Sequence, residues 1–169
     1  SYYYSQPHIK VEGSVFHEGE SIALAGKAWL DREWSSQPLS PNQLGWDWFS
    51  LHFSSGAALM VYRLRQTDGK HWLSGSWIEP DGSSKPLELN DIKLKVLEKR
   101  WVKVGDKKVE LPLHWQIELP TLNKQWQVEA LYDQQWMDTQ FPYWEGVVKV
   151  DSGKNGAGYM ELTGYPITE

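Results

Sequence analysis

Apolar and polar residues alternate at every second position through most of this sequence. Ile9, Val11 and Val15 are separated by lysine, glutamate and serine, and the same spacing recurs as far as Thr163. Successive side chains of a β-strand point to opposite faces of a sheet, so this period predicts strands with one apolar face. No run of ten or more residues carries the helical period. The sequence therefore predicts an all-β protein.

Turn-forming residues divide the chain into about ten expected strands. Glu18-Gly19, Asp68-Gly69, Asp81-Gly82 and Gly105-Asp106 each mark a tight reversal, as such pairs do between hairpin strands. The expected strands cover residues 9–15, 21–34, 46–53, 58–66, 71–79, 87–96, 113–119, 126–132, 143–150 and 159–163. The Ser-Pro-Asn-Gln sequence that begins at Ser40 resembles a helix start and predicts one helical turn over residues 40–44.

Antiparallel strands at this spacing form a sandwich or a barrel. Each expected strand carries one apolar face and one mixed face, which favours a closed sheet around a pocket. We therefore predict a single domain over residues 1–169, folded as an antiparallel up-and-down β-barrel of about eight to ten strands.

Composition excludes several classes of function. The net charge of -5 argues against nucleic-acid partners, and the absence of cysteine excludes thiol catalysis and thiolate metal sites. The five histidines lack metal-ligand spacing, and the sequence contains neither a phosphate loop nor a serine-hydrolase elbow. No apolar run reaches the roughly 20 residues that span a bilayer. We expect no metal, no cofactor and no membrane-spanning segment.

The densest polar segment, residues 28–37, contains Asp31 and Glu33. In an extended chain these two carboxylates share a face at roughly 6.5 to 7 Å, while Arg32 and Trp34 point to the other face. Two carboxylates at that separation raise the pKa of one of them when desolvated, which general acid–base catalysis exploits. Surface ion pairs at a solvated strand end are the competing interpretation.

Asp47 is a second candidate because it shares a strand face with Phe49 and Leu51. If that face forms the core, the aspartate is a buried charge that needs a partner. Arg63 or Arg65, one hairpin away, can supply it. A structural ion pair and a role in a site remain open alternatives.

Tyr62 shares a third face with Met60 and Leu64, and we expect this face to line the barrel interior. The hydroxyl group of Tyr62 then meets either a buried partner or a ligand. The chain also contains eleven tryptophans, among them Trp46 and Trp48 on the strand before. Aromatic side chains bury large areas and also form surfaces on which ligands stack, so composition leaves both roles open.

Four segments of the chain resemble the lipocalin-like family that contains carotenoid 1,2-hydratase, also called hydroxyneurosporene synthase. They are residues 2–9 (YYYSQPHI), 26–37 (GKAWLDREWSSQ), 45–50 (GWDWFS) and 158–165 (GYMELTGY). More narrowly, the chain is similar to the second, C-terminal domain of predicted secreted hydrolases in which two lipocalin-like domains stand in tandem.

This resemblance implies a lipocalin-like barrel with an apolar pocket in a periplasmic or otherwise extracytoplasmic bacterial protein. It also implies an N-terminal lipocalin-like domain and an envelope transport system as partners. Trp34 and Tyr62 match site residues of the hydratases, whereas Arg32 and Leu64 stand where those enzymes carry histidine and aspartate. Arginine keeps its proton at working pH and cannot protonate an alkene, so we do not expect hydration of a carotenoid.

The sequence thus predicts a domain that binds a hydrophobic or amphipathic small molecule, with hydrolase or hydratase-type chemistry that a partner domain completes. The candidate catalytic residues are Asp31, Glu33, Asp47 and Tyr62, the ligand-binding residues are Trp34, Trp46, Trp48, Met60 and Leu64, and the residues that orient the carboxylates are Arg32, Arg63 and Arg65. A non-catalytic module, which carries lipids or binds carbohydrate through exposed tryptophans, remains the alternative.

Overall fold

The computed structural model describes residues 2–35 and 39–169 and falls into two compact units. The first unit spans Ser1–Pro38 and the second Leu39–Glu169. Strands make up 69% of the chain and helix 5%, so the all-β prediction is confirmed. No helix among the described residues is both long and apolar enough to span a membrane.

The first unit is one long antiparallel hairpin of β1 (Tyr2–His17) and β2 (Glu20–Trp34). Its turn contains Glu18 and Gly19, whose φ angles are both positive, at 50° and 87°. Two-residue hairpin turns with positive φ match the right-handed twist of the strands they join. The turn predicted at Glu18-Gly19 is therefore correct.

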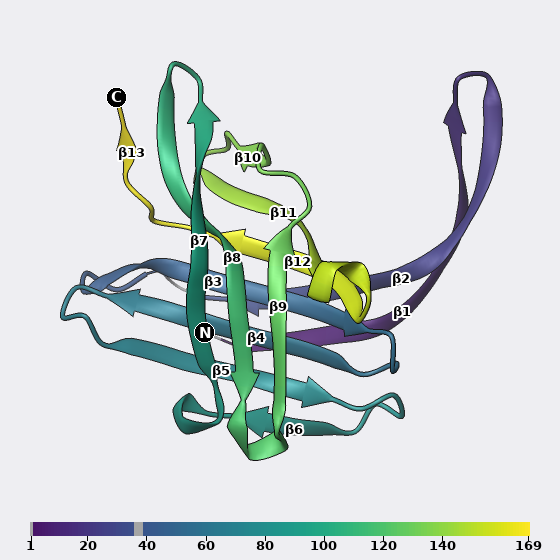
Figure 1. The fold of residues 1–169 in the computed structure, drawn as a ribbon, viewed down its shortest axis with the longest axis horizontal. Coiled ribbons are helices and arrows are strands. Elements are labelled where there is room, and N and C mark those ends of the chain that lie inside the picture. Colours follow the sequence, from purple (N-terminus) through teal and green to yellow (C-terminus); the bar gives the residue numbers. More distant parts are fainter. Residues whose placement is uncertain (1, 36–38) are drawn as a thin grey trace. The chain divides into compact units, whose positions relative to one another are not determined.

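The second unit contains the other eleven strands (Figure 1). They are β3 (Gln43–Phe53), β4 (Ala58–Gln66), β5 (His71–Ile78), β6 (Ser84–Leu87), β7 (Lys93–Val104), β8 (Lys107–Leu119), β9 (Lys124–Ala130), β10 (Trp136–Met137), β11 (Tyr143–Val150), β12 (Gly156–Leu162) and β13 (Ile167–Thr168). Three short 3-10 turns join them: η1 (Leu89–Asp91), η2 (Pro120–Leu122) and η3 (Asp151–Gly153).

These strands form one sheet in the order β13-β8-β9-β11-β12-β3-β4-β5-β6, with β7 beside β8 and β10 beside β11. Within the described residues β6 pairs only with β5, and β7 pairs only with β8. The sheet is therefore open, and the prediction of a closed barrel is wrong. The reason lies after Leu87, where η1 ends the short strand β6 and the chain enters β7, which pairs with β8 instead.

The sheet folds over on itself, so that β3 to β6 run across the direction of β7 to β9 (Figure 1). Phe49 of β3 meets Trp115 of β8 edge to face, with ring centroids 5.4 Å apart. Both rings are fully buried, as is Trp144 of β11. Burial of side chains of this size stabilises a fold by roughly 1.5–3 kcal/mol each. Large side chains thus fill the space between the two layers.

Two local expectations fail. The helical turn predicted over residues 40–44 is absent, because Ser40 closes a reverse turn with its backbone N–H bound to Gln43 Oε1 at 2.7 Å, and β3 begins at Gln43. The single strand expected over residues 87–96 is divided, with Leu87 ending β6 and β7 beginning at Lys93. In both places a polar side chain binds the local backbone and competes with a regular element.

Candidate functional site

The hairpin of β3 and β4 presents two chemically different faces. Asp47, Phe49 and Leu51 of β3 lie on the face that forms the core, and Asp47 is fully buried among them. This shared face is as predicted. Met60 and Tyr62 of β4 alternate with the core residues and therefore project from the opposite face, not from the packed interior as expected.

Asp47 is the centre of a buried charged cluster. Its Oδ2 accepts a hydrogen bond from Nε of Arg63 at 2.7 Å and forms ion pairs with Nη2 of Arg63 at 2.7 Å and Nε of Arg65 at 3.5 Å. The predicted pairing with arginine is therefore confirmed. Its Oδ1 accepts a hydrogen bond from the hydroxyl group of Tyr165 at 2.6 Å. Both carboxylate oxygens of Asp47 are thus occupied by side chains of its own unit.

Aromatic rings cover the two arginines of this cluster. The guanidinium of Arg63 lies 4.9 Å from the ring centroid of Trp115, and that of Arg65 lies 3.9 Å from the ring of Tyr165. Arg65 also donates to the carbonyl oxygen of Thr163. Burial, together with the negative charge of Asp47, raises the pKa of Tyr165 above its ordinary value, so this phenol stays protonated and donates. The cluster joins β3, β4 and the segment after β12.

The opposite face, which we call the aromatic face, carries most of the predicted ligand-binding residues. Its aromatic, large apolar and acidic members are Trp46, Trp48, Met60, Tyr62, Leu64, Trp72, Tyr159 and Glu161, with Tyr143 and Glu145 at its β11 edge, and Ser50, Ser74 and Ser76 lie among them. Cross-strand pairing brings Trp46 opposite Leu64 and Trp48 opposite Tyr62. Trp46, Trp48, Met60 and Leu64, four of the five residues predicted to bind ligand, therefore lie on one face of this sheet, whereas Trp34 belongs to the first unit.

Burial varies across the aromatic face. Met60 is buried and Tyr62 is half-buried, whereas Trp72 and Tyr159 at its two sides are 47% and 48% exposed. The rings of Tyr62 and Trp72 meet edge to face at 5.2 Å. Exposed aromatic rings beside half-buried ones give an apolar ligand both an accessible border and a more sheltered centre.

Two carboxylates lie at one side of the aromatic face. Glu145 of β11 and Glu161 of β12 stand directly opposite each other in the strand register. Glu161 accepts a hydrogen bond from the indole nitrogen of Trp46 at 2.7 Å, and Glu145 accepts one from the hydroxyl group of Tyr143 at 3.1 Å. Partial burial and the charges of both glutamates raise the pKa of Tyr143. Carboxylates held in this way can accept ligand protons or hydrogen bonds.

The sequence analysis did not select these two glutamates, although two features of the sequence point to them. The period of two over residues 143–150 places Tyr143 and Glu145 on one face, and Glu161 lies in a segment singled out for its resemblance to a family. Which strand follows β12 across the sheet depends on tertiary pairing. The sequence therefore gave no reason to join Glu145 and Glu161 to Trp46.

The remaining predicted residues belong to β2 in the first unit. Asp31 is half-buried and accepts hydrogen bonds from Ser5 Oγ and from Trp29 Nε1, the latter at 2.8 Å. Glu33 lies on the same face of β2 as Asp31, as the alternation predicts, and its side chain is exposed. Arg32 is exposed on the other face, and among residues 2–35 and 39–169 no ion pair joins it to either carboxylate. It therefore does not orient them as expected.

Trp34 is 56% exposed at the end of β2. Its ring lies 5.9 Å from that of Tyr4 on β1, at an angle of 33°. The two rings form a small aromatic pair within the hairpin unit.

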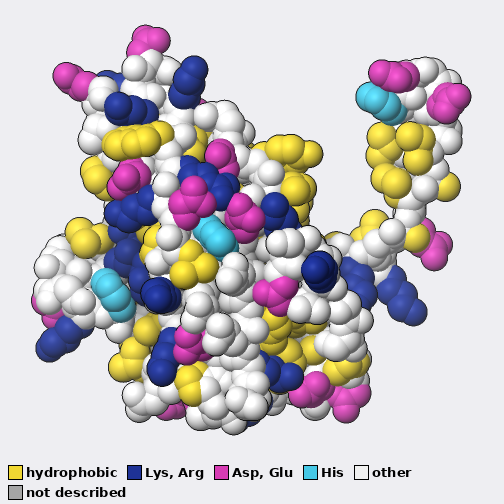
Figure 2. Space-filling view, viewed as in Figure 1, with side chains coloured by type: hydrophobic (Ala, Val, Ile, Leu, Met, Phe, Trp, Pro, Cys, Tyr) yellow, Lys and Arg dark blue, Asp and Glu magenta, His cyan; other side chains and the backbone are white. Residues whose placement is uncertain are grey.

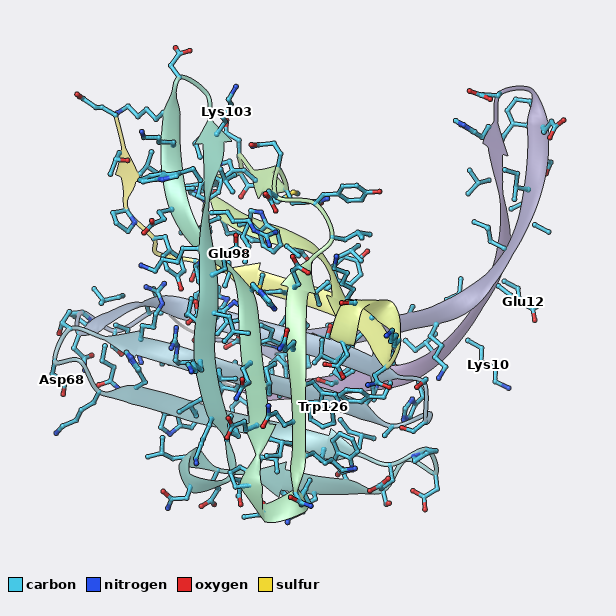
Figure 3. The ribbon with its side chains drawn as sticks, viewed as in Figure 1. Lys10, Glu12, Asp68, Glu98, Lys103 and Trp126 are labelled. Carbon is cyan, nitrogen blue, oxygen red and sulfur yellow. The ribbon has the colours of Figure 1, made fainter. Side chains whose placement is uncertain are left out.

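A further polar cluster lies on the outer face of β7, β8 and β9 (Figures 2 and 3). Arg100 donates to Glu98 at 2.7 Å, to Glu129 at 2.6 Å and to Asp133 at 3.0 Å. Glu98, His114 and Glu129 present ligand atoms within 4.8 Å of one another. Because the guanidinium of Arg100 already bridges the two glutamates, we interpret the group as an ion-pair network. It connects neighbouring strands and lowers the pKa values of Glu98 and Glu129.

Comparison with known proteins gives a family match and similar solved structures, two of which are described here in turn. A model of the AttH-like family matches residues 1–165. A crystal structure of a putative AttH from Nitrosomonas europaea is 34% identical, with a TM-score of 0.82 over 98% of this chain and 52% of its own. Kievitone hydratase from Nectria haematococca is 19% identical, with a TM-score of 0.74 over 96% of this chain and 52% of its own. This chain thus spans about half the length of either protein. No curated protein sequence matches it.

Proposed function

The chain belongs to the AttH-like family, and from this premise we propose that it binds a hydrophobic or amphipathic small molecule on its aromatic face. The observation that carries the proposal is the grouping of Trp46, Trp48, Tyr62 and Trp72 on one side of β3, β4 and β5, away from the core. Single exposed rings such as Trp101 are common on protein surfaces, whereas a group of rings on one face is typical of a surface that contacts a ligand or a partner. An apolar surface with few polar groups is the usual form of a small-molecule site.

We assign hydratase-type chemistry to Glu145 and Glu161. Addition of water to a double bond needs one group that receives a proton from water and one that supplies a proton to carbon. Two carboxylates that face each other across two strands can divide these roles, and Trp46 and Tyr143 hold them in place by hydrogen bonds. The likeness in fold to kievitone hydratase supports this class of reaction over others.

Among the residues predicted from sequence, Tyr62 keeps its place in the proposed site and Asp47 does not. Tyr62 lies on the aromatic face with its ring edge to face with that of Trp72. Asp47 points into the core, and Arg63, Arg65 and Tyr165 occupy its oxygens. We therefore assign Asp47 a structural role.

We also propose that this domain works as the C-terminal half of a tandem protein outside the cytoplasm, as in the secreted hydrolases that it resembles. The lengths of the two solved relatives support a longer protein, since each is about twice the length matched here. Contact with an envelope transport system is part of the same proposal.

A fluorescence titration tests the proposal. Addition of a polyene fatty acid is expected to quench tryptophan emission saturably, and Trp48→Leu should weaken binding about tenfold, or 1.4 kcal/mol. Trp101→Leu is the matched control, because Trp101 is 54% exposed on β7 and belongs to the second unit but not to the aromatic face. Absence of saturable quenching, or equal weakening by both variants, would contradict the proposed surface.

A second assay distinguishes an enzyme from a non-catalytic ligand carrier. Incubation with a panel of neutral alkenes other than carotenes should give the alcohol formed by addition of water to the double bond, and Glu161→Gln should abolish its formation while ligand binding persists. Acyclic carotene should not be hydrated, since Arg32 and Leu64 replace the acidic groups of the carotenoid enzymes. Binding without any product from any alkene would support a non-catalytic carrier instead.

A further inference from the structure

The last hydrogen bonds between β3 and the chain that follows β12 depart from the regular ladder. Leu162 pairs with Asp47 in the strand register, so Thr163 follows opposite Trp46. The N–H of Thr163 donates to the carbonyl oxygen of Trp46 at 3.0 Å, and in a regular antiparallel pair the N–H of Trp46 would donate back to the carbonyl oxygen of Thr163. It donates instead to the side-chain hydroxyl oxygen, Oγ1 of Thr163, at 2.9 Å. The hydroxyl group of Thr163 therefore takes the place of its own carbonyl group.

The carbonyl group of Thr163 is bound by the buried charged cluster. Nη2 of Arg65 donates to its oxygen, and Nε of Arg65 forms an ion pair with Asp47 at 3.5 Å. Tyr165, two residues after Thr163, donates to Asp47 at 2.6 Å. Hydrogen bonds to a charged group are strong and fix the direction of the groups that they join. The cluster thus holds the peptide group after Thr163 and leaves the hydroxyl group to bind Trp46.

Two glycines permit this close approach of the chain segments. Gly45 and Gly164 have φ angles of 149° and 67°, which side chains rarely allow. A Cβ atom at Gly45 would collide with the carbonyl oxygen of Thr163, and one at Gly164 would collide with the carbonyl oxygen of Leu44. Both glycines belong to segments through which the sequence resembles its family. Their role is to bring Thr163 against the start of β3.

We propose that Thr163 is a positioning residue for the pair formed by Trp46 and Glu161, an assignment that rests on the proposed function. Glu161 lies two residues before Thr163, so the two side chains project to the same side of the chain. Thr163 binds the backbone N–H of Trp46, while the indole nitrogen of Trp46 donates to Glu161 at 2.7 Å. Arg65 acts one bond further away, because it keeps the carbonyl group of Thr163 out of the ladder.

This arrangement matters for the reaction because a catalytic carboxylate has to be held within about 0.5 Å of its productive position by the groups behind it. Thr163 holds the backbone of Trp46, and the indole of Trp46 in turn holds Glu161. The hydroxyl group of Thr163 therefore acts through Trp46 and does not itself contact the reacting atoms.

Exchange of indole protons with D2O, followed by NMR, tests the assignment without a ligand. Thr163→Val removes the hydroxyl group but keeps the shape of the side chain, and it should accelerate exchange of the Trp46 indole proton roughly tenfold. Thr163→Ser retains the hydroxyl group and should leave this exchange slow. The Trp46 resonance is identified by its absence from Trp46→Phe. If Thr163→Val does not fold, Thr163→Ala is measured instead, with the same expected result.

Two controls separate a local change from a general loss of stability. The indole nitrogen of Trp115 is fully buried and donates to the carbonyl oxygen of Pro112 at 2.6 Å, so its exchange reports opening of the whole core. The ratio of the Trp46 rate to the Trp115 rate isolates the local effect. Thr168→Val is the matched variant, because the hydroxyl group of Thr168 also binds the backbone, at Lys108, but on β13. This variant should leave the ratio unchanged.

An unchanged ratio in Thr163→Val would overturn the assignment, and so would an equal rise in Thr163→Ser. With the neutral alkene that the wild type converts best, Thr163→Val should lower kcat about tenfold and change KM by less than about twofold. An unchanged kcat beside a raised ratio would show that Thr163 does not position the reacting carboxylate. If the wild type converts no alkene while the ratio still rises, the catalytic role of Glu161 fails and the positioning of Trp46 by Thr163 stands.

Discussion

Both faces of the sheet around β3 and β4 carry a carboxylate beside aromatic rings, but the two carboxylates differ in burial and in their partners. On the core face, Asp47 is fully buried and each of its carboxylate oxygens accepts a hydrogen bond, one from Arg63 and one from Tyr165. On the aromatic face one residue away, Trp46 donates to Glu161 at a half-buried position, and exposed rings stand beside it.

The difference between these faces follows from solvent access. A buried carboxylate stabilises the native state only while its charged partners remain, because an unpaired charge in the interior costs several kcal/mol. A half-exposed carboxylate contributes little to stability and remains available to a ligand. A single step along a strand therefore separates the residues that hold the sheet together from those that can act on a substrate.

Asp47→Ala should give the largest loss of stability. The substitution leaves Arg63 and Arg65 buried without a carboxylate, so the free energy of unfolding should fall by about 3–5 kcal/mol. A urea titration measures this change. A loss below about 0.5 kcal/mol would show that water reaches the cluster and that the two faces do not differ as described.

Tyr165→Phe should have the next largest effect, a loss of roughly 1.5–3 kcal/mol at neutral pH, because it removes a hydrogen bond to a buried charge. Burial raises the pKa of Tyr165 in the folded state above its ordinary value of 10.0. Above pH 10 the unfolded chain therefore loses this proton while the folded chain keeps it, and wild-type stability falls as pH rises. Chemical denaturation between pH 9 and 11 should show a shallower decline for the variant.

Glu129→Gln tests the ion-pair network around Arg100, again through the free energy of unfolding. Its half-exposed position limits the expected loss to about 0.5–1 kcal/mol at pH 7. Arg100 holds the pKa of Glu129 below its ordinary value of 4.5, so this contribution is present above that value and is lost as pH falls through the folded pKa. The stabilities of wild type and variant should thus converge as pH falls below the folded pKa of Glu129. A constant difference across this range would argue for packing instead of charge.

Glu161→Gln should cost the least stability, below about 0.5 kcal/mol, because the amide oxygen can still accept from the indole of Trp46. Its effect should appear in binding instead. Removal of a negative charge is expected to strengthen binding of an anionic polyene fatty acid by about 0.5 kcal/mol and to leave a neutral polyene unchanged. If the substitution changes the binding free energy of both ligands equally, Glu161 does not contact the ligand.

Sequence reasoning predicted the all-β class, most strand positions and the pairing of Asp47 with arginine. These features depend on local chemistry: a period of two assigns residues to faces, Asx-Gly pairs reverse the chain, and a carboxylate among Phe49 and Leu51 must find a cation. The strands β4 and β11 run as expected from Ala58 to Gln66 and from Tyr143 to Val150.

Alternation alone cannot say which face of a sheet is buried, nor which distant strands become neighbours. The sequence assigned Met60, Tyr62 and Leu64 to one face, yet the covering layer of β8 and β9 lies on the other. It also could not place Glu145 opposite Glu161, because that contact depends on the pairing of β11 with β12 and of β12 with β3. Face and register are set by burial summed over the whole sheet, which no single segment encodes.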